Sequence, residues 1–518
     1  MRYLLAIDLG TGSCRAIVFD ETGHQVGIGQ REWRHPAVPG VPGSQSFDTG
    51  RNWGLIGDCI GEAVSMAQID AGDIAAVSST SMREGMVLYD AAGHEIWACP
   101  NVDSRSAAQA TELIASGAAR RIYERGGDWV SITSPARFLW IREHAPETFG
   151  AIAHMGMLSD WVLYRLTDRY VTDPSSGSSS NLFDLARRTW SPESLDVVGL
   201  PLSAMPEVVE PGTVVGTVTE AAAAETGLAA GTPVVAGGAD TQLGLVGIGV
   251  IQPERVTLLG GSFWQMTVVT DQPLIDPEAR LRTLCHSVPG QWMTEGIGFY
   301  SGIAMRWYRD AFCELEQAEA ARRGVDPYVV MEEAASAIPA GSNGLLGVFS
   351  NVMDTKRWVQ ASPSFLGFDV DDPAGSGRTA AIRALEEQAA FAARGHLEII
   401  ESLTGRAVPE VVFTGGAAKG QLWPQIVADV LGRPVRVPAV VESTALGAAM
   451  YAGIGAGIYD SLEDVVERVV RVDRTVVPNA VNRAVYDDAF ARWSAVYRSV
   501  LQLSETGLLR PMWWPAGA

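Results

Sequence analysis

The sequence predicts an α/β protein with two domains of related design, on three observations. The chain of 518 residues is long enough for two sizeable cores. Strand-like apolar runs alternate with segments of helical spacing. A glycine- and hydroxyl-rich turn between two such runs occurs near residue 11 and again near residue 261. The halves match in pattern rather than identity, and we place the boundary near residue 250, with domains over 1–250 and 251–518.

The first half begins with a predicted hairpin and continues as a mixed sheet. Apolar runs at 3–7 and 16–19 flank the turn, and a third strand is expected over 24–30. Apolar residues from Trp53 to Ala67 recur at three- and four-residue spacing, which predicts an amphipathic helix, and a buried strand follows at 74–79.

The second pattern starts at a strand over 234–236 that leads into Gly237-Gly238-Ala239-Asp240. A second hairpin is centred near 261, followed later by a helix, a strand, a glycine turn and a helix from Leu422; the tail beyond Asp460 is mostly helical in pattern. Two polar stretches are predicted loops or insertions, and the tryptophan pair near the end is expected to dock on the body or, alternatively, to form a subunit contact. These segments are 256–270, 379–403, 411–414, 415–420, 174–180, 369–378 and Trp513-Trp514.

Composition limits the functions open to the chain. Lys and Arg total 39 against 60 Asp and Glu, a formal net charge of −21, which disfavours a nucleic-acid or anionic-membrane surface. Five scattered cysteines predict neither a disulfide framework nor a zinc site. The first apolar run is too short for a signal peptide and no apolar span approaches 18 residues, so we expect a cytoplasmic protein without a membrane partner.

The first turn has the chemistry of a phosphate site. Gly10 and Gly12 allow a tight turn, while Thr11, Ser13 and the intervening N–H groups can donate to phosphate oxygens. Asp8, at the end of the strand, can hold a hydrated Mg²⁺. An ordinary hairpin between apolar runs has the same composition, so the turn alone leaves both interpretations open.

Four features occur in one order along the chain: the Asp8 turn, the segment ending in Asp240, the turn at 260–262, and the turn at 415–420 followed by residues 442–447. This arrangement resembles the FGGY carbohydrate kinases, which belong to the actin, Hsp70 and sugar-kinase fold group. The resemblance implies two actin-like (ribonuclease H-like) ATPase domains flanking a cleft. It also implies ATP mainly on the C-terminal domain and a sugar or polyol mainly on the N-terminal one.

The resemblance assigns roles to individual residues. Asp240 matches the catalytic aspartate, which aligns the acceptor hydroxyl and removes its proton during phosphoryl transfer; taken alone, Asp240 would be a helix N-cap. Asp8 would position the metal. Gly416 and Gly420 would lie along the adenosine. Members of the family often have Asn or a small residue where Gly420 stands, so no side-chain contact to the base is expected there and a backbone contact stays open. The implied ATP-binding residues are Thr11, Gly12, Ser13, Arg15, Gly260, Gly261, Ser262, Gly416 and Gly420.

Arg83 and Glu84 resemble the acceptor-binding pair of the glycerol-kinase branch. A carboxylate accepts from hydroxyls and a guanidinium donates in a fixed fork, so together they can orient a vicinal diol. Without that resemblance the pair would be a solvated loop. Trp97 and residues 101–105 match the family's tryptophan-aspartate-arginine segment, for which a core tryptophan and a structural salt bridge are the alternative.

Several short stretches resemble one branch of the family, the autoinducer-2 kinases. That resemblance implies ATP- and Mg²⁺-dependent phosphorylation of the terminal hydroxyl of linear 4,5-dihydroxy-2,3-pentanedione. A glycerol or pentulose kinase remains an alternative, as does a non-catalytic nucleotide-switched sensor, and the sequence leaves homo-oligomers open. The stretches are 30–35, 81–85, 97–99, 261–265 and 305–313.

Overall fold

The computed structural model describes residues 2–353, 359–440 and 442–512, and two mixed sheets dominate it. The first sheet has the order β12-β13-β4-β1-β2-β3 and the second the order β16-β17-β15-β14-β20-β21-β22. The first consists of β1 (Tyr3–Leu9), β2 (Ser13–Asp20), β3 (Gln25–Glu32), β4 (Ile74–Ser81), β12 (Val214–Thr217) and β13 (Pro233–Ala239). The second consists of β14 (Val256–Gly260), β15 (Trp264–Thr270), β16 (Arg282–Cys285), β17 (Trp292–Gly298), β20 (Val411–Thr414), β21 (Val435–Pro438) and β22 (Val472–Val476).

The two sheets repeat one topology. In each, an antiparallel hairpin (β1–β2 or β14–β15) gains a third antiparallel strand on one side. Two parallel strands follow on the other side, β4 and β13 in the first sheet and β20 and β21 in the second. The shared order confirms the predicted α/β fold of two related units, and it confirms that both glycine turns join hairpin strands.

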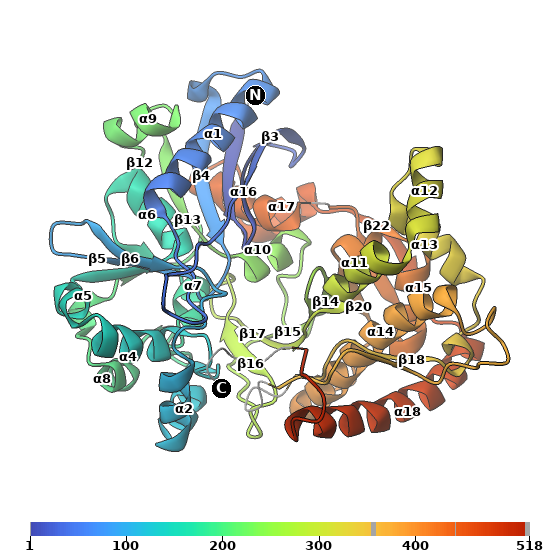
Figure 1. The fold of residues 1–518 in the computed structure, drawn as a ribbon. Coiled ribbons are helices and arrows are strands. Elements are labelled where there is room, and N and C mark those ends of the chain that lie inside the picture. The colour runs from blue at the N-terminus through green and yellow to red at the C-terminus, as the bar shows by residue number, and fades with distance from the viewer. Residues whose placement is uncertain (1, 354–358, 441, 513–518) are drawn as a thin grey trace.

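Helices cover both faces of the first sheet (Figure 1). On one face, α1 (Thr49–Ala67) and α6 (Leu158–Thr167) pack on the strands; Trp53, Ile56 and Ile60 of α1 are buried there, as their spacing predicts. On the other face lie α10 (Asp240–Gly247), α16 (Ser443–Gly455) and α17 (Leu462–Val469). We call this sheet with its helices the first lobe.

The second sheet carries a separate core. One face is covered by α14 (Arg378–Thr404), α15 (Leu422–Leu431) and α18 (Ala480–Glu505), and their apolar side chains pack on β14, β15 and β20. The predicted helices over 379–403 and from Leu422 are therefore confirmed. Strand β22 lies in the tail that was expected to be mostly helical; its partly exposed, polar sequence gave no strand pattern. This sheet and its helices form the second lobe.

Helices α10 and α16 lie on the same face of the first sheet and touch backbone to backbone. A Cβ on Gly247 of α10 would lie 1.9 Å from the Ser443 carbonyl oxygen, and one on Gly447 of α16 would lie 2.0 Å from that of Leu243. Only glycine allows this approach. In the chain α16 and α17 lie between β21 and β22 of the second sheet, yet they pack on the first sheet, so a domain boundary near residue 250 stays a prediction.

The remaining elements extend the two lobes. A small sheet of order β6-β5-β7 with helices α2 to α5 adjoins the first lobe. In the first half the elements are β5 (Met86–Tyr89), β6 (Glu95–Cys99), α2 (Ala107–Ala115), α3 (Ala118–Gly126), α4 (Ser134–His144), α5 (Pro146–Ala151), β7 (His154–Met157), β8 (Val171–Thr172), β9 (Phe183–Asp184), β10 (Thr189–Trp190), α8 (Pro192–Val198), β11 (Glu207–Val208) and α9 (Glu220–Thr226). In the second half they are α11 (Ser301–Phe312), α12 (Glu314–Arg323), α13 (Pro327–Ser336), β18 (Leu346–Val348) and β19 (Ser364–Leu366).

The prediction of a loop or insertion over the serine-rich stretch 174–180 is wrong. This stretch forms the buried helix α7 (Pro174–Ser179). Asp173 caps it by accepting from the backbone N–H groups of Ser175 and Ser176 at 2.7 and 3.0 Å. Ser179 donates its hydroxyl to the carbonyl oxygen three residues back, at 2.7 Å. Local hydrogen bonds of this kind let a polar sequence be buried without unpaired groups.

Two other predictions concern the ends of elements. The stretch 369–378 is a loop as far as 377, and α14 begins at Arg378. The tryptophan pair at 513 and 514 lies outside the described residues, so its docking stays a prediction. Within the described ranges, no helix combines the length and the apolar composition needed to span a bilayer.

Candidate active site between the two lobes

Two neighbouring cavities lie where the lobes meet. The larger, of about 860 Å³, is lined by the glycine turns of the second sheet and the start of α16. The smaller, of about 290 Å³, is lined by residues of both lobes, including Asp240. The consecutive residues Ser262 and Phe263 line the larger and the smaller cavity respectively, and the Thr444 hydroxyl donates to the Asp240 carbonyl oxygen at 3.3 Å. The cavities therefore meet at the N-termini of α10 and α16.

The larger cavity gathers part of the predicted nucleotide site. Arg15, Gly261, Ser262 and Gly416 line it, together with Lys419. The start of α16 also lines it, and the N–H groups at a helix N-terminus favour phosphate. Of the other predicted ATP-binding residues, Thr11 lines the smaller cavity and hydrogen-bonds Asn101 at 3.1 Å, and four do not line either cavity: Gly12, Ser13, Gly260 and Gly420.

The turn at 415–420 has a conformation that only glycine adopts readily. Gly415 has φ 96° and ψ −175°, and a Cβ there would lie 2.7 Å from the Gly260 carbonyl oxygen. Arg474 of β22 holds the far side of the turn, since its Nη2 donates to the carbonyl oxygens of Ala418 and Gly420 at 2.9 and 2.5 Å. No sequence pattern pointed to Arg474, because β22 was not predicted.

Asp8 and Arg15 form a charged cluster at the first hairpin. The Arg15 guanidinium contacts Asp8 Oδ2 and Glu442 Oε2, each at 2.5 Å. Burial raises the pKa of Asp8, and the Arg15 charge opposes that shift. Nowhere in the described ranges do three His, Cys, Asp or Glu side chains form a metal-binding group. The Asp8 side chain is 3% exposed, is paired with Arg15 and lines neither cavity, so its role as a ligand of Mg²⁺ stays a prediction.

Asp240 is the first residue of α10, at the end of β13. Its Oδ1 accepts from the backbone N–H of Thr241 at 2.7 Å, and Arg83 Nε lies 4.0 Å away. Burial raises the pKa of Asp240 to about 6, opposed by the Arg83 charge and reinforced by the charges of Asp8 and Glu84. Its side chain is 34% exposed into the cavity, so the carboxylate can be reached by a ligand.

Helix α7 holds the backbone just before Asp240 in place. The Ser175 hydroxyl accepts from the Ala239 N–H at 2.9 Å and donates to Asp173 at 2.5 Å. A Cβ on Gly238 would lie 2.6 Å from the same hydroxyl. The segment predicted as a loop therefore fixes the junction of β13 and α10 that carries Asp240.

Arg83 and Glu84 are buried, so the alternative of a solvated loop is wrong. Glu84 has φ 62°, a left-handed conformation that costs a non-glycine residue energy and is typical of functional sites. Arg137 donates to the Glu84 carbonyl oxygen, and the Glu84 N–H donates to Ser179 Oγ at 3.4 Å. Both side chains line the smaller cavity with Asp240, so the structure brings the three predicted acceptor residues together.

The tryptophan-aspartate-arginine segment divides between structure and site. Arg105 lies over the Trp97 ring at 5.2 Å and pairs with Asp103 at 2.7 Å, which is the structural arrangement. The residues between them, Asn101, Val102 and Ser104, line the smaller cavity.

Sequence reasoning missed three charged residues of the smaller cavity and its floor. Asp128 and Arg282 line the cavity, and Glu295 is fully buried behind it. Arg282 Nη1 contacts Glu84 Oε1 at 2.8 Å, and Arg83 Nη1 contacts Glu295 Oε1 at 2.8 Å. These pairs join positions about 200 residues apart, which no local pattern shows.

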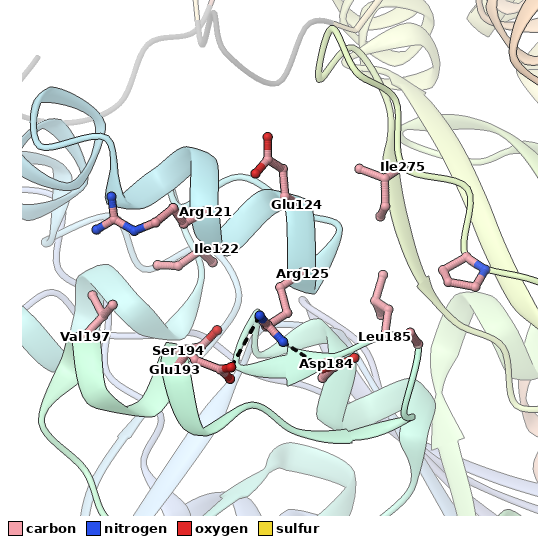
Figure 2. Close-up of a pocket in the computed structure, with 12 residues that line it drawn as sticks. Arg121, Ile122, Glu124, Arg125, Asp184, Leu185, Glu193, Ser194, Val197 and Ile275 are labelled. Carbon is pink, nitrogen blue, oxygen red and sulfur yellow. Dashed lines mark hydrogen bonds and ion pairs between the residues drawn. The ribbon is translucent and has the colours of Figure 1, made fainter.

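A third cavity, of about 520 Å³, lies away from these residues against α3 and α8 (Figure 2). Its Arg125 is paired with Asp184 at 2.9 Å and with Glu193 at 3.4 Å. Because the guanidinium is already neutralised and no predicted site residue lines this cavity, its size does not make it the active site.

Comparison with known proteins identifies the family of the chain. Two family models match the chain: the N-terminal domain of the FGGY family of carbohydrate kinases over residues 3–247, and its C-terminal domain over 257–456. The autoinducer-2 kinase of Klebsiella pneumoniae is 44% identical over 520 residues, covering 100% of this chain and 98% of that protein. The autoinducer-2 kinase of Yersinia pestis is 43% identical over 518 residues, covering 99% and 98%.

A solved structure also matches. The crystal structure of xylulose kinase from Rhodospirillum rubrum superimposes with a TM-score of 0.83 at 28% identity and covers 96% of this chain and 99% of that chain. With the repeated sheet topology, this similarity confirms the predicted pair of actin-like domains.

Proposed function

The chain belongs to the FGGY family of carbohydrate kinases, and we propose that it transfers the γ-phosphoryl group of ATP to the primary hydroxyl of 4,5-dihydroxy-2,3-pentanedione, the autoinducer-2 precursor. It is thus a phosphotransferase with an alcohol group as acceptor. The relatives named autoinducer-2 kinase, similar over the full length, support this choice of acceptor. The observation that carries the chemistry is Asp240, a carboxylate with a pKa of about 6 between the two cavities.

The smaller cavity suits a small, uncharged, oxygen-rich acceptor. Its volume of about 290 Å³ is at the lower end of small-molecule sites. Three carboxylates line it (Glu84, Asp128, Asp240) against two guanidiniums (Arg83, Arg282), and this excess of negative charge disfavours an anionic acceptor. The same charge favours release of a phosphorylated product. Glu84 would accept from the hydroxyl next to the reacting one, while Arg83 donates to a neighbouring oxygen.

In the proposed reaction Asp240 aligns the primary hydroxyl and takes its proton as the oxygen bonds to the γ-phosphorus, and ADP leaves with the electron pair of the broken bond. ATP would occupy the larger cavity, with its phosphates toward the N-terminus of α16 and the turn at Gly261 and Ser262. Mg²⁺ held by the phosphates and Asp8 would supply positive charge to the phosphoryl oxygens. Closure of the lobes would exclude water and limit ATP hydrolysis.

Coupled-enzyme detection of ADP tests the proposal with a panel of acceptors: the dione, glycerol, erythritol and xylulose. We expect the highest kcat/KM for the dione. A preference for glycerol or a pentulose would replace the proposed acceptor by one of those alternatives. ADP release with none of them would contradict a kinase that uses this class of acceptor and favour a nucleotide-switched sensor.

We also infer a cytoplasmic location and no nucleic-acid partner. The use of ATP fits the cytoplasm, and the five cysteines are all free and buried. The net charge of −21 disfavours binding to nucleic acid.

A further inference from the structure

A network of five buried charged side chains joins the two lobes at the floor of the acceptor cavity. Arg83, Glu84 and Asp128 come from the first lobe and its extension, and Arg282 and Glu295 from β16 and β17 of the second sheet. Three ion pairs cross between the lobes: Arg83 to Glu295 at 2.8 Å, Arg282 to Glu84 at 2.8 Å, and Arg282 to Asp128 at 3.2 Å. The side chains that would bind the acceptor are thus held by the opposite lobe.

Glu295 is the centre of this network. Its Oε1 accepts from Arg83 and also from Arg282 Nε, so one oxygen holds both guanidiniums. Burial acts to raise the pKa of Glu295, but the two arginine charges outweigh it, and the pKa lies below its ordinary value. Buried ion pairs are weak contributors to stability, because desolvation offsets their attraction. The arrangement is therefore better explained by the positions that it gives to Arg83 and Arg282 than by a contribution to stability.

Arg282 has donors left over. Its Nε contacts Glu295, and its Nη1 is shared between Glu84 and Asp128. In the described part of the chain no acceptor pairs with Nη2, and the side chain lines the cavity. A guanidinium only donates hydrogen bonds, so the group that Nη2 suits is an acceptor such as a carbonyl oxygen.

We propose that Arg282 binds an oxygen of the acceptor substrate through Nη2, and that Glu295 is a positioning residue that holds Arg83 and Arg282 side by side. The acceptor site is then built from both lobes. Two adjacent guanidiniums suit two adjacent oxygens, as in an α-hydroxy ketone or a vicinal dione. This role rests on the proposed function, because it takes the acceptor to be a small oxygen-rich molecule. It adds that Arg282 is the residue that favours carbonyl compounds over simple polyols.

The test compares Arg282→Gln with wild type by steady-state kinetics, using the dione, xylulose and glycerol as acceptors. Losing a hydrogen bond to a charged group should raise the KM of the carbonyl acceptors about tenfold, with the KM for ATP within about twofold of wild type. Glycerol, which has no carbonyl group, should lose less. The matched control is Arg280→Gln, two residues earlier, whose guanidinium pairs with Asp276 outside the cavity; both KM values should stay at wild type.

Two further variants test the same contacts if Arg282→Gln does not fold. Arg282→Lys keeps the charge but lacks the second amino group, so the acceptor KM should still rise at least about threefold. Glu295→Gln keeps the shape and should raise the acceptor KM without changing that for ATP. A wild-type acceptor KM in a folded Arg282 variant would overturn the proposal.

Wild-type turnover of the three acceptors separates the choice of acceptor from the role of Arg282. If wild type turns over xylulose or glycerol but not the dione, the choice of acceptor fails, and the Arg282 comparison is made on the compound that is used. If wild type turns over none, calorimetric binding of the three compounds to wild type and Arg282→Lys replaces kinetics. Weaker binding to the variant supports the role of Arg282; equal binding, or no binding to wild type, overturns it.

Discussion

The two cavities that meet at Asp240 are built in different ways. The larger one is formed by turns and a helix N-terminus, and it presents backbone groups of Gly261 and Gly416 to solvent. The smaller one is formed by buried charged side chains that pair across the lobes, such as Arg282 with Glu84. Backbone donors at a turn suit phosphates, which all nucleotides share, whereas paired side chains can be varied to suit one acceptor.

The residues that bind the nucleotide are therefore distinct from those that determine which acceptor is used. The nucleotide side depends on backbone conformation, which a few glycines determine. The acceptor side depends on long-range pairing, so a change at one residue alters the position of its partner in the other lobe. Substitutions on the two sides should therefore affect different kinetic constants.

The largest effect is expected at the junction of the cavities, for Asp240→Asn. The substitution keeps the shape but removes the base, so turnover should fall by ~10²-fold or more while the Kd for ATP stays within about threefold. Single-turnover kinetics and nucleotide titration measure the two quantities. Asp196→Asn, on the exposed face of α8, is the control and should behave as wild type. Turnover within about threefold of wild type would show that Asp240 is not the base.

A smaller effect is expected from pH. The base must be ionised, and burial raises the pKa of Asp240 to about 6, so kcat/KM for the acceptor should be constant above pH 7 and fall about tenfold between pH 7 and 5. A pH–rate profile at saturating ATP measures this. The residual activity of Asp240→Asn should lack this decline. The same decline in the variant would assign the titration to another group, such as ATP itself.

The smallest effect is expected on the nucleotide side, from two neighbouring glycines. Gly415→Ala places a Cβ in a glycine-only conformation and against Gly260, and should destabilise the protein by about 1–3 kcal/mol and raise the KM for ATP. Gly416→Ala has no atom within 4 Å of the new Cβ and should keep the wild-type melting temperature. Thermal unfolding of both variants decides the matter, and equal melting temperatures would contradict the proposed strain at Gly415.

The sequence was sufficient for the parts of the site that depend on neighbours in the chain. Both hairpin turns, the strand before Asp240 and the helix from Leu422 have periodic or glycine-based patterns that local physics explains. Helix α7 was missed because its serines satisfy one another only once Asp173 caps them, and the composition alone is typical of a loop. Arg282 and Glu295 were missed because their partners lie across the interface between the lobes.

The proposed role of Asp240 requires that the phosphoryl group is transferred to the primary hydroxyl that this residue holds. Phosphorus–proton correlation NMR of the product formed from ATP and 4,5-dihydroxy-2,3-pentanedione identifies the esterified oxygen. We expect a single phosphate ester coupled to the protons of the terminal methylene group. An ester on the secondary hydroxyl, or inorganic phosphate without any ester, would contradict this role of Asp240.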